Sequence, residues 1–489
     1  MPLLETPAQS GEPSVLAQKD SRRMAAIRER FNQLAGTRAA WQIKAGYYYK
    51  DQRRYLQFLV REGLKILEIG CGLGDQLAAL KPSRGVGLDI SSAMVAEASR
   101  RHPTLEFRVG GLEALRDDEV FDVILLVDVI GHLLDVEAVL RGMRRFCTPS
   151  TRIVIAYYNF LWEPILWLAE RLGLKMPQQQ QNWLSPADIR NLLRLADFEV
   201  VKSESRLLLP KQVPLLASIV NRYLAYLPLV NRLCLTQYVV ARTRGIEAQR
   251  EFTVSIVIPC RNEKGNIEAA ITRLPRFGLR QEIIFVDGHS TDGTVEEIQR
   301  VMRQWPQYDI KLFIQDGKGK GDAVRKGFTH ATGDILMILD ADLTMPPEDL
   351  PKFYDAIASG KGEFINGSRL VYPMEEEAMR FLNLIGNKFF SMAFSWLLGE
   401  RIKDTLCGTK VLFRKDYERI VANRAYFGEF DPFGDFDLLF GASKLNLKIL
   451  EVPIRYQERT YGTTNINRFQ HGWLLLKMTV YGFFRLKAV

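Results

Sequence analysis

Two series of apolar runs, separated by polar stretches that suit helices, follow one another along the chain. The first series predicts strands at residues 65–69, 85–89, 105–109, 120–127, 152–157, 198–207 and 235–242. The second predicts strands at residues 254–259, 282–287, 310–315, 335–340, 364–366 and 448–454. Strands that alternate with helices favour a mainly parallel sheet with helices on both faces. The pattern therefore predicts an α/β protein with two tandem nucleotide-scale domains.

A polar segment that contains Gly245 separates the two series. We expect a polar leader over 1–37 with a short helix near 22–34, a first domain over 38–242, a linker over 243–251 and a second domain over 252–489 that ends in an amphipathic stretch at 471–486. The composition, 47% hydrophobic and 25% charged, is typical of folded globular protein and excludes a disordered or fibrous chain.

The positive charge is concentrated in one place. Residues 201–250 hold eight Lys and Arg against two Asp and Glu, and they are rich in Leu, Val and Tyr. A basic and apolar stretch favours a membrane-surface element, although a buried helical hairpin with solvated arginines explains it equally well. We expect no nucleic-acid partner, because no RNA-binding motif accompanies the charge.

The location is predicted from what the chain carries. The longest apolar runs fall far short of the ~18 residues that span a bilayer, and the first residues show no secretory-signal pattern. Five cysteines without a Cys-x-x-Cys pair suit a reducing compartment. We therefore expect a cytoplasmic protein. The stretch at 471–486 suits a peripheral anchor at the inner face of the cytoplasmic membrane, although a final helix docked on the second domain explains it slightly better.

Three glycines mark the first candidate site. Gly70, Gly72 and Gly74 directly follow the first predicted strand, and Asp89 ends the second. Glycines remove Cβ atoms where the backbone bends tightly and touches a ligand, and a carboxylate at the second strand end can accept the ribose hydroxyls of an adenosine. The third glycine comes one residue earlier than in the dinucleotide fingerprint, which argues against NAD.

This pattern, together with segments 47–49, 89–94 and 126–133, resembles the class I S-adenosylmethionine-dependent methyltransferases over about 38–242. The resemblance implies a Rossmann-like domain that binds S-adenosylmethionine through Glu68, Gly70, Gly72, Gly74, Asp89, Met94 and Asp128. Asp89 would hold the ribose, Met94 would lie near the adenine, and Asp128 and His132 would lie at the catalytic mouth. The family's acid after the third strand is replaced by Gly110 and Gly111, and the backbone of Gly111 and Leu112 would substitute for it. For His132 a structural role is favoured over a catalytic one, since a lone histidine after a strand is often only hydrogen-bonded structure and only a hydroxyl acceptor needs a base.

Two segments on the acceptor side exceed a minimal methyltransferase. Residues 159–181 and 207–231 carry aromatic residues, leucines, five prolines and scattered charges. They could form a lid for an apolar acceptor, lie on a bilayer or pack on the second domain.

A pair of acids marks the second candidate site. Asp340 and Asp342 stand at the end of a predicted strand, where residues i and i+2 share one face. Two such carboxylates repel each other unless a cation lies between them, and oxygen ligands beside a diphosphate suit Mg²⁺ or Mn²⁺. Taken alone, the pair is equally consistent with acids that cap the helix predicted to follow.

The acids are accompanied by further motifs in order, at 258–263, 286–287, 317–321, 367–369, 404–408, 413–414 and 451–453, followed by Arg459 and Gly462. The set resembles family 2 glycosyltransferases of the GT-A fold, and more narrowly their polyprenyl-phosphate branch, over about 252–470. The resemblance implies a nucleotide-diphosphate sugar donor, with Pro259, Glu263, Asp287 and Lys320 on the donor and Asp340 and Asp342 on the metal that bridges its diphosphate. It also implies transfer with inversion.

The acceptor is predicted less sharply. In the branch that this chain resembles, arginines at the positions of Arg369 and Arg380 clamp a lipid phosphate, and a guanidinium fork suits that geometry. A sugar-hydroxyl acceptor would instead need a base, for which Asp435 is the candidate. We expect a bifunctional enzyme of a glycolipid or surface-polysaccharide pathway. The alternative is a glycosyltransferase acting on a hydroxyl, with a catalytically idle S-adenosylmethionine-like domain that positions it.

Overall fold

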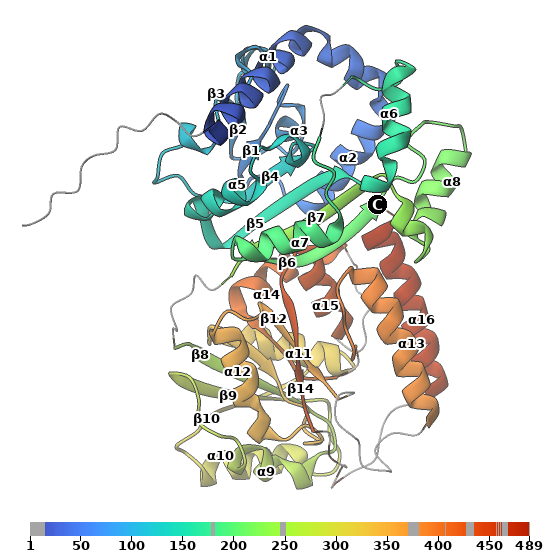
Figure 1. Ribbon diagram of the computed structural model, residues 1–489. Helices are drawn as coiled ribbons and strands as arrows, with labels where there is room; N and C mark the ends of the chain where they lie inside the picture. Colours follow the sequence, from blue (N-terminus) through green and yellow to red (C-terminus); the bar gives the residue numbers. More distant parts are fainter. Residues whose placement is uncertain are drawn as a thin grey trace, which may run out of the picture. The chain divides into compact units, whose positions relative to one another are not determined.

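The computed structural model describes residues 15–177, 181–244, 251–369, 381–405, 407–426, 435–455, 457, 459, 461 and 468–488 (Figure 1). The chain folds into two compact units, and it passes from the first to the second after Thr243. Each unit is built on its own seven-stranded sheet. The predicted architecture of two tandem α/β domains is confirmed.

The first sheet has the strand order β3-β2-β1-β4-β5-β7-β6. Its strands are β1 Lys65–Ile69, β2 Arg84–Asp89, β3 Glu106–Val109, β4 Phe121–Val127, β5 Cys147–Tyr158, β6 Phe198–Arg206 and β7 Thr236–Thr243. β1 pairs in parallel with β2 and β4, whereas β7 pairs antiparallel with β5. The order reverses between β1 and β4, and ligands of open α/β sheets bind at such a point, beyond the carboxyl ends of the strands.

The first helix differs from the expected frayed leader. Helix α1 runs without interruption over Val15–Lys44, across the boundary that we predicted at 37. It is held because Leu34 and Ala35 are buried in one cluster with Leu73 and Met94, so this stretch belongs to the core of the first unit. The helix predicted near 22–34 is therefore part of a longer one, and the expectation of a frayed chain around it was wrong for the rest of residues 15–37.

Seven further helices complete the described part of the first unit. They are α2 Gly46–Leu59, α3 Asp75–Ala79, α4 Ser92–Arg101, α5 Val136–Met143, α6 Glu163–Arg171, α7 Pro186–Leu195 and α8 Leu216–Arg222. Side-chain caps fix several starts: the Ser91 hydroxyl accepts the Met94 N–H at the start of α4, and Ser185 and Asp188 form a capping box at α7. The α4 cap matters for function because it lies directly after Asp89.

The second sheet has the order β10-β9-β8-β11-β13-β12-β14. Its strands are β8 Thr253–Cys260, β9 Arg280–Asp287, β10 Asp309–Ile314, β11 Ile335–Ile338, β12 Phe364–Ser368, β13 Lys410–Phe413 and β14 Ile449–Pro453. The sequence analysis missed β13, a strand of four residues that pairs antiparallel with both β11 and β12. The sheet is therefore mixed, although β10, β9, β8 and β11 are parallel as predicted.

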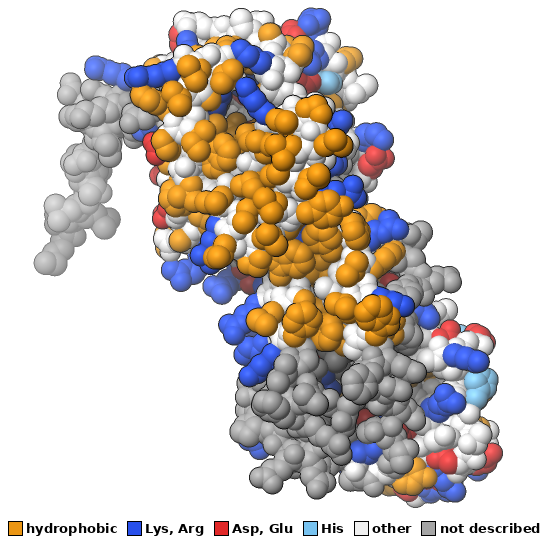
Figure 2. Space-filling model, turned by 90° about the vertical axis from the view of Figure 1, so that its right-hand side faces the viewer, with side chains coloured by type: hydrophobic (Ala, Val, Ile, Leu, Met, Phe, Trp, Pro, Cys, Tyr) orange, Lys and Arg blue, Asp and Glu red, His pale blue; other side chains and the backbone are white. Residues whose placement is uncertain are grey.

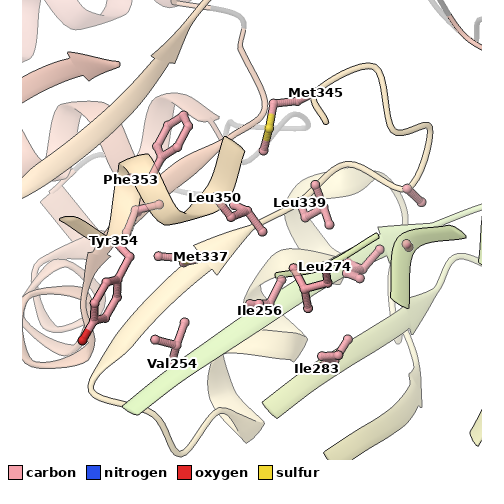
Figure 3. Packing of buried hydrophobic residues seen from close by; sticks show 14 of the residues in the cluster. Val254, Ile256, Leu274, Ile283, Met337, Leu339, Met345, Leu350, Phe353 and Tyr354 are labelled. Carbon is pink, nitrogen blue, oxygen red and sulfur yellow. The ribbon is translucent and has the colours of Figure 1, made fainter. Parts of the chain in front are cut away.

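Apolar side chains from strands and helices meet in the core of this unit (Figure 3). Ile256 of β8 and Met337 of β11 are fully buried there, and Phe353 of the helix after β11 packs into the same cluster. The described helices are α9 Ile267–Thr272, α10 Thr294–Gln304, α11 Lys320–His330, α12 Leu350–Ala358, α13 Phe381–Leu398, α14 Arg414–Ala422, α15 Asp435–Lys444 and α16 Arg468–Gly482. In the described part of the chain, every helix is too short or too polar to cross a bilayer.

Candidate functional site

The acids of the second unit gather at the carboxyl ends of three neighbouring parallel strands. Glu263 follows β8, Asp287 ends β9 and Asp340 follows β11. The strand order reverses between β8 and β11, so this edge is the ligand-binding crevice of an open α/β sheet. The sheet thus brings together side chains that stand far apart in the sequence.

Asp340 forms an ion pair with Lys320, the first residue of α11, with 2.5 Å between Nζ and Oδ1. Burial opposes ionisation of this carboxyl, but the charge and hydrogen bond of Lys320 hold the pKa of Asp340 below its ordinary value. Gly408 lies against the pair, and a Cβ added there would collide with the Asp340 carboxylate and the Lys320 ammonium. The pair therefore depends on a glycine at position 408.

Arg459 joins two of the predicted acids. Its guanidinium lies 2.9 Å from Asp342 Oδ2 and 3.1 Å from Glu263 Oε1. The other oxygen of Asp342 accepts hydrogen bonds from the hydroxyl and N–H of Thr344, at 2.8 and 3.1 Å. Burial raises the pKa of Glu263. The sequence analysis placed Arg459 in a motif without giving it a role, and in the structure it bridges Glu263 and Asp342.

The turn after β9 is fixed by Asp287. This buried carboxylate accepts hydrogen bonds from the backbone N–H and the hydroxyl of Ser290, at 2.9 and 2.5 Å. Pro259 lies beside it in the sheet, since Pro259 and Cys260 of β8 pair with Val286 and Asp287 of β9. The two residues predicted on the nucleoside side are thus neighbours.

The chemistry of these donors fits a divalent cation shared with a substrate. Among the residues that the structure describes, no three acidic, histidine or cysteine side chains cluster into a ready cage. Mg²⁺ is commonly bound by one or two carboxylates while substrate phosphates and water supply its other ligands. Asp340 and Asp342 meet that requirement, provided that Lys320 and Arg459 turn from the carboxylates to the phosphates.

The predicted acceptor residues are only partly described. Arg369 makes a two-point ion pair with the buried Asp404, Nε to Oδ2 at 2.7 Å and Nη2 to Oδ1 at 2.9 Å, and its N–H donates to the same carboxylate. Arg380 and Gly462 lie outside the described residues. Asp435 is the first residue of α15. Sequence reasoning noted the segment that carries Asp404 but did not foresee this ion pair.

In the first unit, Asp89 holds the glycine loop. Its carboxylate accepts the N–H of Gly72 and the N–H of Ser91, both at 2.9 Å, and burial raises its pKa. Gly72 has φ +53°, and a Cβ there would lie 3.1 Å from Nε of Arg38. Asp89 and Arg38 therefore both lie against the backbone of Gly72 in the glycine loop.

Arg38 is a functional candidate that the sequence did not reveal, because it stood at the edge of the expected leader. Its Nε is buried without a hydrogen-bond partner anywhere in the described chain. A buried donor without a partner is costly, and an anionic ligand group would satisfy it. With the open loop and Asp89 beside it, this donor makes the site fit the carboxylate end of S-adenosylmethionine.

Glu68 and Met94 lie behind the loop. The buried Glu68 carboxylate accepts the N–H of Leu77 in α3 at 3.2 Å, and burial raises its pKa to about 8. The Met94 side chain is fully buried against Leu34 and Leu73. In the structure, these two predicted cofactor ligands contact protein and support the loop.

The predicted catalytic mouth is lined by a hydrogen-bonded network. The Tyr48 hydroxyl donates to both oxygens of Asp128 at 2.9 Å, and Gln52 donates to one of them at 3.0 Å. Burial raises the pKa of Asp128. Burial, with the charges of Arg38 and Lys175, lowers the pKa of His132 to about 4, so its imidazole is neutral near pH 7.

One acid after the third strand also escaped the sequence analysis. The Gly111 N–H, expected to be open to the adenine, donates to Glu113 Oε1 at 2.7 Å. An acidic residue, Glu113, therefore lies three residues after Gly110, close to the position where the family usually has one. The signal was present in the sequence, but only the turn shows that Glu113 folds back.

The geometry defines two transferase domains in tandem. A methyltransferase-domain model matches residues 41–203, and the glycosyl transferase family 2 model matches residues 255–421. The chain belongs to glycosyltransferase family 2, and a methyltransferase domain precedes the transferase.

Named relatives align with the second unit. A dolichol-phosphate mannosyltransferase of Pyrococcus furiosus is 32% identical over 220 residues, which cover 44% of this chain and 59% of the relative. A dolichyl-phosphate beta-glucosyltransferase of Saccharomyces cerevisiae is 31% identical over 233 residues, 42% of this chain and 68% of the relative. The chain thus spans about three fifths of the length of the Pyrococcus protein.

Solved structures resemble each unit distantly. A SAM-dependent methyltransferase of Thermotoga maritima is 18% identical, covers 45% of this chain and 99% of its own, and gives a TM-score of 0.35. Glucosyl-3-phosphoglycerate synthase of Mycobacterium tuberculosis is 18% identical, covers 48% and 80%, and gives a TM-score of 0.36. Likenesses of this size carry no argument about substrates.

Proposed function

We propose that the second unit transfers a sugar, with inversion, from a nucleotide-diphosphate donor to a polyprenyl phosphate. The observation that carries this proposal is the pair Asp340 and Asp342, each bonded to a cation, Lys320 or Arg459, beside the donor-side acid Glu263. The printed names of the Pyrococcus and Saccharomyces relatives support the lipid-phosphate acceptor.

The charges suggest how these residues act. Asp340 and Asp342 would hold Mg²⁺ or Mn²⁺, which when bound supplies positive charge to the departing diphosphate. Lys320 and Arg459 would exchange their carboxylate partners for phosphate oxygens, while Glu263 and Asp287 fix the nucleoside. An acceptor phosphate oxygen forms the new bond to the anomeric carbon as the bond to the diphosphate breaks. This acceptor is already anionic, so no base is required.

A sugar hydroxyl is the second candidate acceptor. The Arg369–Asp404 ion pair favours it, because this pair already neutralises one of the two arginines expected on the lipid phosphate. A hydroxyl acceptor requires a base, for which Asp435 at the start of α15 is our candidate.

The test is a transfer assay on the purified full chain. UDP- and GDP-sugars are offered with Mn²⁺, with Mg²⁺ or with a chelator, and the acceptor is either a short-chain polyprenyl phosphate in detergent or a simple glycoside. Mass spectrometry should find a glycosyl phospholipid that disappears with the chelator. A glycoside product alone would transfer the proposal to the hydroxyl acceptor, and no product with any pair would refute both.

We further propose that the first unit methylates a product or precursor of the same pathway. S-adenosylmethionine, when bound, supplies an electrophilic methyl group. Arg38 would bind its carboxylate, Asp89 its ribose, and neutral His132 could take a proton from a hydroxyl acceptor. Calorimetry with S-adenosylmethionine tests this, and absence of heat and of any thermal shift would favour the idle positioning domain.

We propose the inner face of the cytoplasmic membrane as the place of action. The carboxyl-terminal stretch 471–486 supports this through Trp473, which is 60% exposed on α16 with the Lys477 ammonium 5.7 Å from its ring centre. An exposed aromatic beside a lysine suits the bilayer interface.

A further inference from the structure

The first unit exposes an unusual amount of apolar surface on two segments. One is α6 with the residues that flank it, 160–174, and the other is 207–233, which contains α8. Leu215 is 82% exposed and Leu229 is 76% exposed, and Ile165, Trp167, Leu172 and Ile219 are exposed as well. Figure 2 shows hydrophobic side chains gathered over the side of this unit that carries α6 and α8 in Figure 1. We call the exposed side chains of these two segments the apolar platform.

The two segments are joined, so their exposed side chains belong to one built surface. The Asn159 side-chain amide donates to the carbonyls of Arg232 and Cys234, at 2.8 and 2.9 Å. The Trp162 indole N–H donates to the carbonyl of Leu233 at 2.7 Å. These bonds anchor the ends of the segments against each other while the leucines between them stay outside.

The exposed leucines of the apolar platform are not what attaches its segments to the rest of the first unit. Leu166 is the buried residue of α6 and lies in a small cluster with Tyr48, Leu207 and Leu235. The other leucines of this segment stay between 42% and 63% exposed. Soluble surfaces seldom expose contiguous apolar area of this kind, and where they do it marks a docking surface for protein or membrane.

The charge on the platform selects a lipid surface as the occupant. Segment 207–233 carries Lys211, Arg222 and Arg232, all exposed, and no acidic residue. Segment 160–174 carries two glutamates, the exposed Glu163 and Glu170, which forms an ion pair with Lys175. On α6, the Arg171 guanidinium lies 3.7 Å from the ring centre of Trp167, a cation and an aromatic held together at one edge. Leucines surrounded by cations and interfacial aromatics match an anionic bilayer, whose head groups attract Lys and Arg while its acyl region takes the leucines.

We infer that the apolar platform of the methyltransferase unit inserts into the interface of an anionic membrane. The leucines of 207–233 would enter the acyl boundary, and Lys211, Arg222 and Arg232 would remain at the head groups. This inference deepens the proposed membrane location, because it adds the first unit to the carboxyl-terminal stretch as a docking element. It rests on that location, but its test needs no transfer reaction.

Vesicle flotation of the full chain tests the platform. The double variant Leu215→Glu/Leu229→Glu should bind phosphatidylcholine vesicles that contain phosphatidylglycerol about tenfold or more weakly than the unchanged chain. The matched control is Leu195→Glu/Leu279→Glu, at positions 47% and 63% exposed outside both platform segments, which adds the same charge and should bind normally. Equal loss in both double variants, or no loss in the first, would overturn the inference.

A second variant guards against a folding defect. Lys211→Gln/Arg232→Gln leaves the leucines in place, so it should keep its thermal midpoint and lose the preference for phosphatidylglycerol over pure phosphatidylcholine. An unchanged preference would count against a lipid occupant. Sedimentation completes the test, since self-association that the Leu215→Glu/Leu229→Glu variant abolishes would assign the platform to a second copy of the chain.

One further variant separates docking from catalysis. Asp340→Asn should float with vesicles like the unchanged chain even if it transfers no sugar. Docking without transfer by the unchanged chain would leave the platform standing and refute the proposed glycosyl transfer. Transfer in detergent without docking would do the reverse.

Discussion

The two candidate sites lie at equivalent places, the carboxyl ends of parallel strands, yet they balance charge in different ways. At the glycine loop, Asp89 is satisfied by two backbone N–H groups, and Arg38 keeps a buried donor without a partner in the described chain. At the paired aspartates, Asp340 and Asp342 are each bonded to a cationic side chain.

The difference teaches what each site asks of its ligand. The glycine loop is assembled in advance, and a ligand carboxylate would complete it without breaking an ion pair. Asp340 and Asp342 are already paired with Lys320 and Arg459. A metal bound with a diphosphate would have to displace these two cations from the carboxylates. We therefore expect the first site to bind its ligand alone and the second to bind metal and nucleotide together.

The largest effect should come from the aspartates themselves. Asp340→Asn or Asp342→Asn should lower sugar transfer about 100- to 1,000-fold, because the variant would no longer hold the cation whose positive charge stabilises the leaving diphosphate. Initial rates at saturating donor measure this. The control Asp309→Asn removes an acid that pairs with Arg280 away from the site and should keep its rate. Sugar transfer by Asp340→Asn at the rate of the unchanged chain would contradict the role given to the aspartate pair.

A backbone substitution should sharpen the comparison next. Gly408→Ala places a methyl group against Asp340 and Lys320, and the displacement should cost about 100-fold in sugar transfer. Gly472→Ala in α16 is the matched control, since nothing lies within 4 Å of the added methyl. Binding of S-adenosylmethionine should be unchanged in both variants, and an active Gly408→Ala would show that the Lys320–Asp340 pair is dispensable.

In the first site, the expected effect is smaller. Arg38→Gln should weaken S-adenosylmethionine binding about tenfold, the value of one charge-assisted hydrogen bond. Calorimetry gives the Kd, and Arg28→Gln, an exposed arginine on the same helix, should leave it unchanged. The comparison with S-adenosylhomocysteine should show the same loss, because the carboxylate is common to both. No loss with either ligand would place the carboxylate elsewhere.

The mildest effect concerns acid stability. His132 has its pKa lowered to about 4 in the folded chain, so between its ordinary value of 6.5 and 4 the unfolded state binds a proton that the native state does not. Stability should therefore fall as pH falls through this window, by about 3 kcal/mol at most. Denaturant unfolding of the chain and of His132→Asn measures it, and an equally steep loss in the variant would contradict the assignment.

The sequence predicted strands such as β1 and β11 well because each is a short apolar run bounded by glycine or acid. It also located the acids of both sites, since strand ends place them in one crevice. The sequence could not predict which side chains form ion pairs with these acids. The pairings of Arg459 with Asp342 and of Arg369 with Asp404 join segments 117 and 35 residues apart, and no local pattern records such distances.

The failures have physical causes of the same kind. Helix α1 was mistaken for a leader because its polar residues dominate the pattern, whereas its buried side chains in the described part, Ile27, Leu34 and Ala35, are few. Arg38 lies on this helix, and so the sequence analysis missed it as a functional candidate. Strand β13 is four residues long and antiparallel, too short for a periodicity to be recognised. Tertiary contact, and not local propensity, determines these elements.

The central claim is that Asp340 and Asp342 bind a divalent cation only together with a nucleoside diphosphate. Titration calorimetry of Mn²⁺ into the chain, with and without UDP or GDP, tests it directly. We predict weak Mn²⁺ binding alone, much tighter binding with one of the nucleotides, and loss of that gain in Asp342→Asn. Mn²⁺ binding that ignores both nucleotides, or that survives in Asp342→Asn, would contradict the account.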